Sequence, residues 1–194
     1  MRTKKEQATL TRRELIDAAA QEFRLAGYSG AGIDDIAKRA GLTSGAFYRH
    51  FSSKSEIFAV VITEGLNEIL EGIRATKAGA PSDWQQAFTR FYFSNVRLKA
   101  IETGCVLPSL TAEVVRADDD AREAFQDGLN AIIRELSDDS DKSAAILHTN
   151  SILAALALMA GGLMLARASK SKRLADEIAV ASSQKVLELL ASKD

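Results

Sequence analysis

The chain has 194 residues, of which 46% are hydrophobic and 26% charged, a composition that excludes a disordered or fibrous protein. Only two prolines occur, while alanine and leucine are frequent, which favours an almost entirely helical fold because proline interrupts helices. A single cysteine, Cys105, excludes an internal disulfide and a multi-cysteine metal site. The two histidines, His50 and His148, lie far apart in the sequence, so we expect no metal site, and we also expect no cofactor.

The net charge of −1 hides an uneven distribution. Residues 1–54 carry ten Lys and Arg against six acids, whereas the remainder carries fifteen against twenty. A basic N-terminal region on an acidic remainder is typical of a nucleic-acid-binding module joined to a second functional domain. No basic segment followed by an apolar run opens the chain, so we expect a cytoplasmic protein.

The first predicted helix begins at a capping-box pattern formed by Thr11 and Glu14. Apolar residues then recur at three- and four-residue spacings up to Phe23, which is the pattern of an amphipathic helix. Gly27 predicts the end of this helix, because glycine readily takes the positive φ of a helix stop.

Residues 32–51 predict a helix-turn-helix motif. Helices over 33–40 and 44–50 flank a break at Gly41, and Thr43 is a good N-cap for the second helix. The outer side of that helix carries short or hydrogen-bonding groups and one cation: Ser44, Gly45, Ala46, Tyr48, Arg49 and His50. Such a surface fits a DNA major groove, where arginine can read guanine; the alternative is an ordinary helical hairpin with a polar exterior.

Residues 11–62 resemble a TetR-type DNA-binding domain. The resemblance is carried by an ordered set of residues: Ala37, Gly41, Gly45, Phe47, Tyr48, His50, Phe51 and Lys54. It implies an all-α protein with an N-terminal three-helix DNA-binding domain over residues 9–69, followed by a helical ligand-binding and dimerisation domain over residues 70–194. It also implies a sequence-specific transcriptional regulator, usually a repressor that binds a palindromic double-stranded DNA operator as a homodimer and is released by a small-molecule inducer.

The resemblance also implies roles for single residues. Positions that commonly contact phosphate in the family are occupied by Thr43, Ser44, Tyr48, His50 and Lys54. Gly45 stands where the backbone approaches DNA, while Ala46 and Arg49 occupy variable positions that face bases. Gly32 stands where relatives often carry Ser or Thr as the cap of the second helix, so one phosphate contact is in doubt.

A second capping box, Ser53 with Glu56, predicts a fourth helix that runs to about Ala75, and a break at residues 79–82 precedes a fifth helix over 83–101. The candidate ligand pocket lies in and after this fifth helix: Trp84, Phe88, Phe91, Tyr92, Cys105 and Leu107. Plain hydrophobic core is the alternative for the aromatic residues. For Cys105, the alternatives are an inert buried residue and a thiol that senses oxidants or electrophiles.

Residues 151–166 contain no charge, but they are fewer than the roughly 20 that a membrane span needs. A helix that is apolar all round must be buried all round, so we expect one face on the chain's own core and the other on a partner subunit. The candidate interface residues are Leu153, Leu156, Met159, Leu163 and, from the last helix, Ile178.

No spacing of Ser, His and acids, no phosphate-binding glycine loop and no metal-ligand pattern is found, so we expect no enzymatic activity and no catalytic residue. A helical dimerisation protein that does not bind DNA is a more distant alternative. It would leave the basic N-terminal region and the surface around Arg49 without an explanation.

Overall fold

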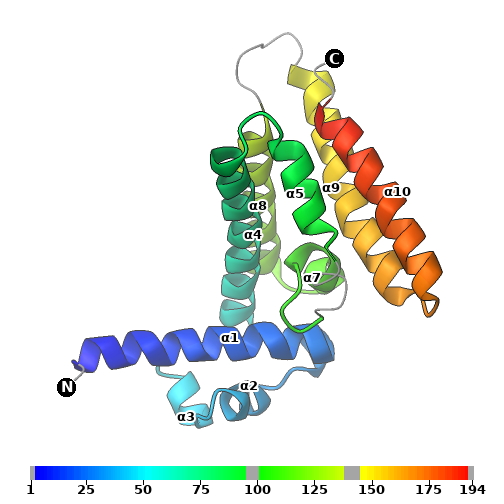
Figure 1. Ribbon diagram of the computed structural model, residues 1–194. Coiled ribbons are helices and arrows are strands. Elements are labelled where there is room, and N and C mark those ends of the chain that lie inside the picture. The colour runs from blue at the N-terminus through cyan, green and yellow to red at the C-terminus, as the bar shows by residue number, and fades with distance from the viewer. Residues whose placement is uncertain (1–2, 95–100, 138–144, 192–194) are drawn as a thin grey trace.

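The computed structural model describes residues 3–94, 101–137 and 145–191, which form helices joined by short connections and, in those ranges, no strand. The all-α fold is therefore confirmed. The helices are α1 (Lys4–Gly30), α2 (Ile33–Arg39), α3 (Ser44–Phe47), α4 (Lys54–Gly79), α5 (Trp84–Tyr92), α7 (Val106–Val114), α8 (Asp119–Leu136), α9 (Ala145–Ala168) and α10 (Lys172–Ala191). Figure 1 shows α1, α2 and α3 at one end of the molecule, which we call the head, with the remaining helices standing on it as the body.

The helix α1 begins seven residues before the predicted start at Thr11. Its N-cap is Thr3, whose side chain accepts the Glu6 N–H at 3.2 Å while the Glu6 carboxylate accepts the Thr3 N–H at 2.7 Å. The prediction of a start at Thr11 is wrong because this earlier capping box and the helix-forming residues after it extend the helix. At the other end, Gly27 has a φ of 73° and kinks the helix, so that the chain turns toward α2.

The helix α4 connects the head to the body. Its N-cap Ser53 accepts the Glu56 N–H, and the helix then continues to Gly79, past the expected domain boundary between residues 69 and 70, without a break. One long face packs along α8. The two helices touch closely at Gly128, where an added Cβ would lie only 2.8 Å from the Cβ of Leu66.

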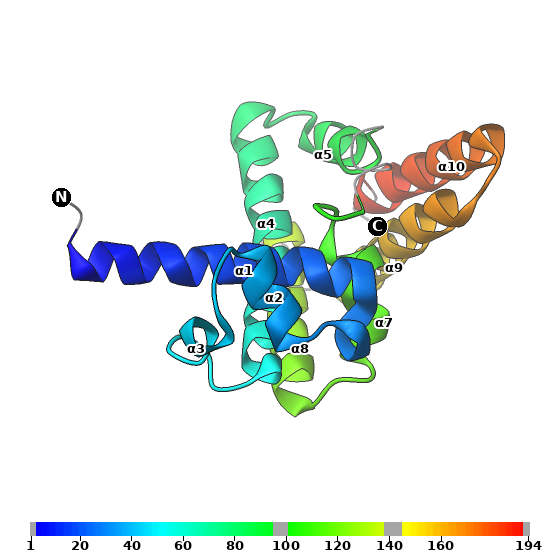
Figure 2. The same cartoon turned by 90° about the horizontal axis from the view of Figure 1, so that it is seen from below.

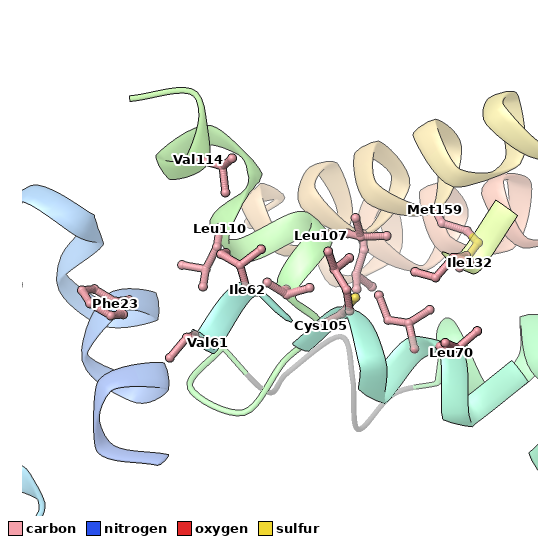
Figure 3. Packing of buried hydrophobic residues seen from close by; sticks show 14 of the residues in the cluster. Phe23, Val61, Ile62, Leu70, Cys105, Leu107, Leu110, Val114, Ile132 and Met159 are labelled. Carbon is pink, nitrogen blue, oxygen red and sulfur yellow. The ribbon is translucent and has the colours of Figure 1, made fainter. Parts of the chain in front are cut away.

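The helix α5 is shorter than the sequence predicts. It ends at Tyr92, with Phe93 and Ser94 outside the helix, so the prediction that it continues to Ile101 is wrong; residues 95–100 lie outside the described part of the chain. After it, α7 begins next to Cys105. Figure 3 shows Cys105 and Leu107 among buried side chains of the body that include Ile62, Leu70, Ile132 and Met159.

The helices α9 and α10 pair along their length and form one side of the body (Figure 1). They approach closely at Gly162, where a Cβ would lie 2.7 Å from that of Ser182. By length and composition alone, residues Thr149–Ala168 could cross a membrane. One side of α9, however, is part of the protein core, with Ile152, Ala155, Met159 and Leu163 buried.

Candidate nucleic-acid interface

The connection between α2 and α3 is a tight turn that only glycine makes easily. Gly41 has a φ of 70°, its N–H bonds the Lys38 carbonyl at 3.0 Å, and the Leu42 N–H bonds the Ala37 carbonyl at 2.8 Å. Ala37 is buried, so α2 lies close to its neighbours at that point. The turn thereby fixes the angle at which α3 leaves α2.

The helix α3 is short and continues as turns. The Thr43 side chain caps it by accepting the Ala46 N–H at 3.3 Å, and regular helix ends at Phe47 rather than at the predicted His50. Turn hydrogen bonds carry the chain on to Phe51, whose N–H bonds the Phe47 carbonyl at 3.0 Å. Because Phe47 and Phe51 are both buried, they hold this segment on the head and leave its other side in solvent.

The predicted DNA-contacting residues lie together on that outer side. Thr43, Gly45, Tyr48 and Arg49 are exposed, Tyr48 to 58%, while Ser44, Ala46 and His50 are half-buried. Arg49 makes no ion pair with any described residue, so its guanidinium is available to a ligand. The Ser44 hydroxyl donates to the Asp34 carboxylate at 2.5 Å, a contact between α3 and α2 that the sequence pattern did not reveal.

Lys54 makes several contacts within the head. Its ammonium donates to the carbonyl oxygens of Tyr28 and Ala31, at 2.9 and 3.1 Å, and lies 4.7 Å from the centre of the Tyr28 ring. These contacts connect the start of α4 to the end of α1 and to Ala31, which follows it. These contacts give Lys54 a structural role in the head, and its role as a phosphate contact stays a prediction.

Two further charged residues support the motif. The guanidinium of Arg12 lies 4.7 Å from the centre of the Phe51 ring. The Glu56 carboxylate accepts both the backbone N–H and the hydroxyl of Ser52, at 2.6 and 2.7 Å, and these hydrogen bonds lower the pKa of Glu56 below its usual value. Both contacts fix the chain where it leaves the helix-turn-helix motif.

The predicted pocket residues fall into two groups. Phe88, Tyr92, Cys105 and Leu107 are buried in one core, whereas Trp84 is half-buried beside Lys77 and Phe91 is 46% exposed. The Tyr92 hydroxyl donates to the Cys105 sulfur at 3.3 Å, and Cys105 is only 3% exposed, which does not favour the thiol-sensor alternative. Thr89 is buried in the same helix, and its hydroxyl has no hydrogen-bond partner in the described part of the chain.

A cleft of about 250 Å³ lies between α1, α4 and residues 102–103, not among these aromatic residues. Its lining is largely charged and includes Arg13, Asp17, Glu64 and Arg24. Burial lowers the pKa of the Arg24 guanidinium, which donates to the Gly104 carbonyl at 3.0 Å. Among the described residues, no group of three or more His, Cys, Asp or Glu could hold a metal ion.

Three of the predicted interface residues are already buried within the single chain. Leu156, Met159 and Leu163 lie in the core, so a partner subunit could not reach them. The side of α9 that carries them packs against the chain's own helices, which does not favour them as interface residues. Leu153 is 46% exposed, and Ile178 is half-buried.

Comparisons with known proteins agree with this geometry. Residues 15–61 match the family model described as bacterial regulatory proteins, tetR family. The HTH-type transcriptional activator FasR of Mycolicibacterium smegmatis is 40% identical over 63 residues, which is 32% of this chain and 29% of the relative. The chain thus spans less than a third of the length of that relative.

Two solved structures resemble the whole described fold. A tetR-family transcriptional regulator from Agrobacterium tumefaciens superposes with a TM-score of 0.74 at 16% identity, covering 91% of this chain and 97% of the other. The reduced form of NemR from E. coli superposes with a TM-score of 0.71 at 20% identity, covering 89% and 94%. At these identities the likeness concerns the fold.

Proposed function

The chain belongs to the tetR family of bacterial regulatory proteins, and on that premise we propose that it is a transcriptional repressor of the cytoplasm that binds a palindromic operator as a homodimer and is released by a small-molecule inducer. The observation that carries the proposal is the exposed surface of α3. Thr43, Tyr48 and Arg49 project into solvent from a segment that buried Phe47 and Phe51 fix to the head.

This surface fits the major groove of DNA. Gly45 and Ala46 are small, so the backbone of α3 can approach the base edges closely. The guanidinium of Arg49, which forms no ion pair with a described residue, can donate two hydrogen bonds to guanine. Thr43, Tyr48 and His50 carry groups that can donate to phosphates at the groove edges and fix the orientation of the head. Ser44, which donates to Asp34, would have to release that hydrogen bond to do the same.

The outer side of α9 is the surface for a second subunit. Exposed or half-exposed small and apolar residues recur there at helical spacing: Ala154, Ala157, Gly161 and Leu165. Leu165 is 62% exposed, and Leu174 on α10 is exposed on the same pair of helices. Small residues permit close contact between backbones, and a twofold axis would bring both copies of this surface together.

A pair of substitutions on α9 tests this surface. Leu165→Glu places a carboxylate on the outer side, so we expect a folded monomer in sedimentation velocity. Leu156→Glu places it in the core of the single chain, so we expect loss of cooperative unfolding instead. A dimer of unchanged affinity for Leu165→Glu would exclude this side of α9 as the interface.

An inducer would act through the body core around Phe88, Tyr92 and Leu107, where an apolar or aromatic molecule would contact apolar side chains. An acceptor group on that molecule could receive a hydrogen bond from the Thr89 hydroxyl. This core is mechanically joined to the head through α7. Arg24 of α1 donates to Gly104 just before α7, and the Tyr28 N–H donates to the Glu113 carboxylate at 2.8 Å near its other end. A ligand that displaces α7 would therefore alter the head, as release from DNA requires.

Selection of bound duplexes from random DNA tests the proposed function. We expect enrichment of an inverted repeat whose half-sites lie about one helical turn, roughly 34 Å, apart or somewhat more. A reporter gene placed behind the selected sequence should be expressed less when the protein is present. Failure to enrich any sequence would leave the dimerisation protein without DNA binding as the surviving alternative.

A further inference from the structure

The N-terminal part of α1 projects beyond α2 and α3 (Figure 2). All residues from Thr3 to Thr9 are exposed, and buried residues begin only at Leu15. We call residues 4–10 the arm; at about 1.5 Å per residue these extend the helix by roughly 10 Å. In Figure 2, which views the molecule from the side of α2 and α3, the arm reaches past α3 into open space.

The arm is a preformed helix. In the capping box of its first turn, the side chains of Thr3 and Glu6 accept hydrogen bonds from each other's backbone N–H groups. Its helical geometry also fixes which side faces the DNA-binding surface. Lys5, Thr9 and Arg12 follow at spacings of four and three residues and so share one side of the helix.

Contacts at the base of the arm orient that side. Arg12 lies over the ring of Phe51, at the end of the helix-turn-helix motif. Arg13 is turned to another side, where it pairs with Asp17 and with Glu64 of α4 at 2.6 and 2.7 Å. The side that carries Lys5 is therefore the side nearest the DNA-binding surface, two helical turns further out.

The charge of the arm suits a polyanion. Lys4 and Lys5 are exposed and form no ion pair with any residue in the described ranges, while the one acid of the arm, Glu6, is engaged in the cap. Apart from Ala8 and Leu10 the arm is polar, so it offers little to an apolar partner.

The direction of the arm places it outside the operator half-site. In Figure 1 it points away from α9 and α10, where the second subunit of the proposed dimer would lie. In such a dimer the two arms diverge along the DNA. We propose that the arm binds phosphates of the duplex that flanks each half-site, through Lys5 with Lys4 beside it, and so extends the bound segment without reading its sequence. This inference rests on the proposed operator binding.

The test compares two duplexes that carry the same selected operator. One ends at the edges of the inverted repeat, and the other continues for about ten base pairs, one helical turn, on each side. Affinity is measured by fluorescence anisotropy between 50 and 200 mM salt for the wild-type protein and for Lys4→Gln/Lys5→Gln. The control, Lys172→Gln/Arg173→Gln, removes the same charge from the first turn of α10, which lies on the opposite side of the molecule from the arm (Figure 1). Circular dichroism verifies that α1 remains helical, and Lys4→Arg/Lys5→Arg restores the charge.

We expect the wild-type protein and the control to bind the long duplex more tightly than the short one. The slope of log affinity against log salt concentration should be steeper by about two on the long duplex, because each of the two heads gains one phosphate contact at about 0.9 per contact. The Lys4→Gln/Lys5→Gln variant should bind both duplexes alike, and the arginine variant should behave as wild type. Equal binding of the two duplexes by the wild-type protein, or an equal loss on both by the glutamine variant, would overturn the arm's role while leaving operator binding intact. Absence of binding by the wild-type protein to either duplex would overturn both proposals.

Discussion

The substitution Lys54→Met tests whether Lys54 stabilises the head or contacts DNA. Methionine keeps much of the aliphatic side chain but removes the ammonium that donates to the carbonyls of Tyr28 and Ala31. Hydrogen bonds from a charged donor contribute about 1.5–3 kcal/mol each when buried, and less at a half-buried site such as this one. The cation–π contact with Tyr28 adds about 0.5–1 kcal/mol.

We therefore expect Lys54→Met to lower the free energy of unfolding by about 2 kcal/mol, which corresponds to roughly 4–8 °C in Tm for a chain of this size. Urea unfolding at a fixed protein concentration measures the change. The matched control is Lys38→Met on α2, an exposed lysine that forms no ion pair with described residues; it should change the free energy of unfolding by less than about 0.5 kcal/mol.

The salt dependence of DNA binding provides the second readout. If Lys54 is structural, the slope for Lys54→Met remains that of the wild-type protein even where the affinity falls. An unchanged free energy of unfolding, together with a salt dependence of DNA affinity that is smaller by about two per dimer, would refute the structural role and support the phosphate contact.

Three further predictions concern the head and the helix packing. Arg49→Ala should relax base preference at one position per half-site, at a cost of about 1–3 kcal/mol for the preferred base in a competition among operator variants; an equal loss for all four bases would argue against base reading. Gly128→Ala should lower the free energy of unfolding in urea by about 1–3 kcal/mol because its Cβ would collide with Leu66, whereas Gly72→Ala, which meets only ordinary contacts near 3.7 Å, should raise it by about 0.5–1 kcal/mol. Because the pKa of Glu56 is lowered in the folded state, its contribution to stability is complete above the unfolded pKa near 4.5 and is lost as the pH falls through the lower folded value. Between pH 6 and pH 3, Glu56→Gln should therefore lose less free energy of unfolding than the wild-type protein does.

Local signals predicted the helix-turn-helix motif well. The positive φ of Gly41, the cap at Thr43 and the burial of Phe47 all follow from interactions between residues a few positions apart. The same kind of signal was ambiguous at the start of α1, since Thr3 with Glu6 and Thr11 with Glu14 are both capping boxes by pattern. The helix uses the earlier one because nothing between the two patterns breaks it.

Long-range contacts explain what the sequence did not predict. Lys54 donates to the Tyr28 and Ala31 carbonyls, which lie beyond the kink at Gly27 and more than twenty positions away in the sequence. In α9 the apolar residues surround the helix, so no periodicity indicated that Leu156 faces the core while Leu165 faces solvent. Only packing against the other helices decides between those two sides.

The two hydrogen bonds between α1 and α7 constrain how the head can turn. Because these hydrogen bonds lie near opposite ends of α7, we expect α7 and the C-terminal third of α1 to move together. Ser109, which lies between those two contacts, accepts a hydrogen bond from Arg167 of α9 at 3.1 Å. A displacement of α9 would therefore act on the middle of α7. Because α3 is fixed to α1 through the buried core of the head, a small rotation of α7 would change the separation of the two α3 helices in the proposed dimer.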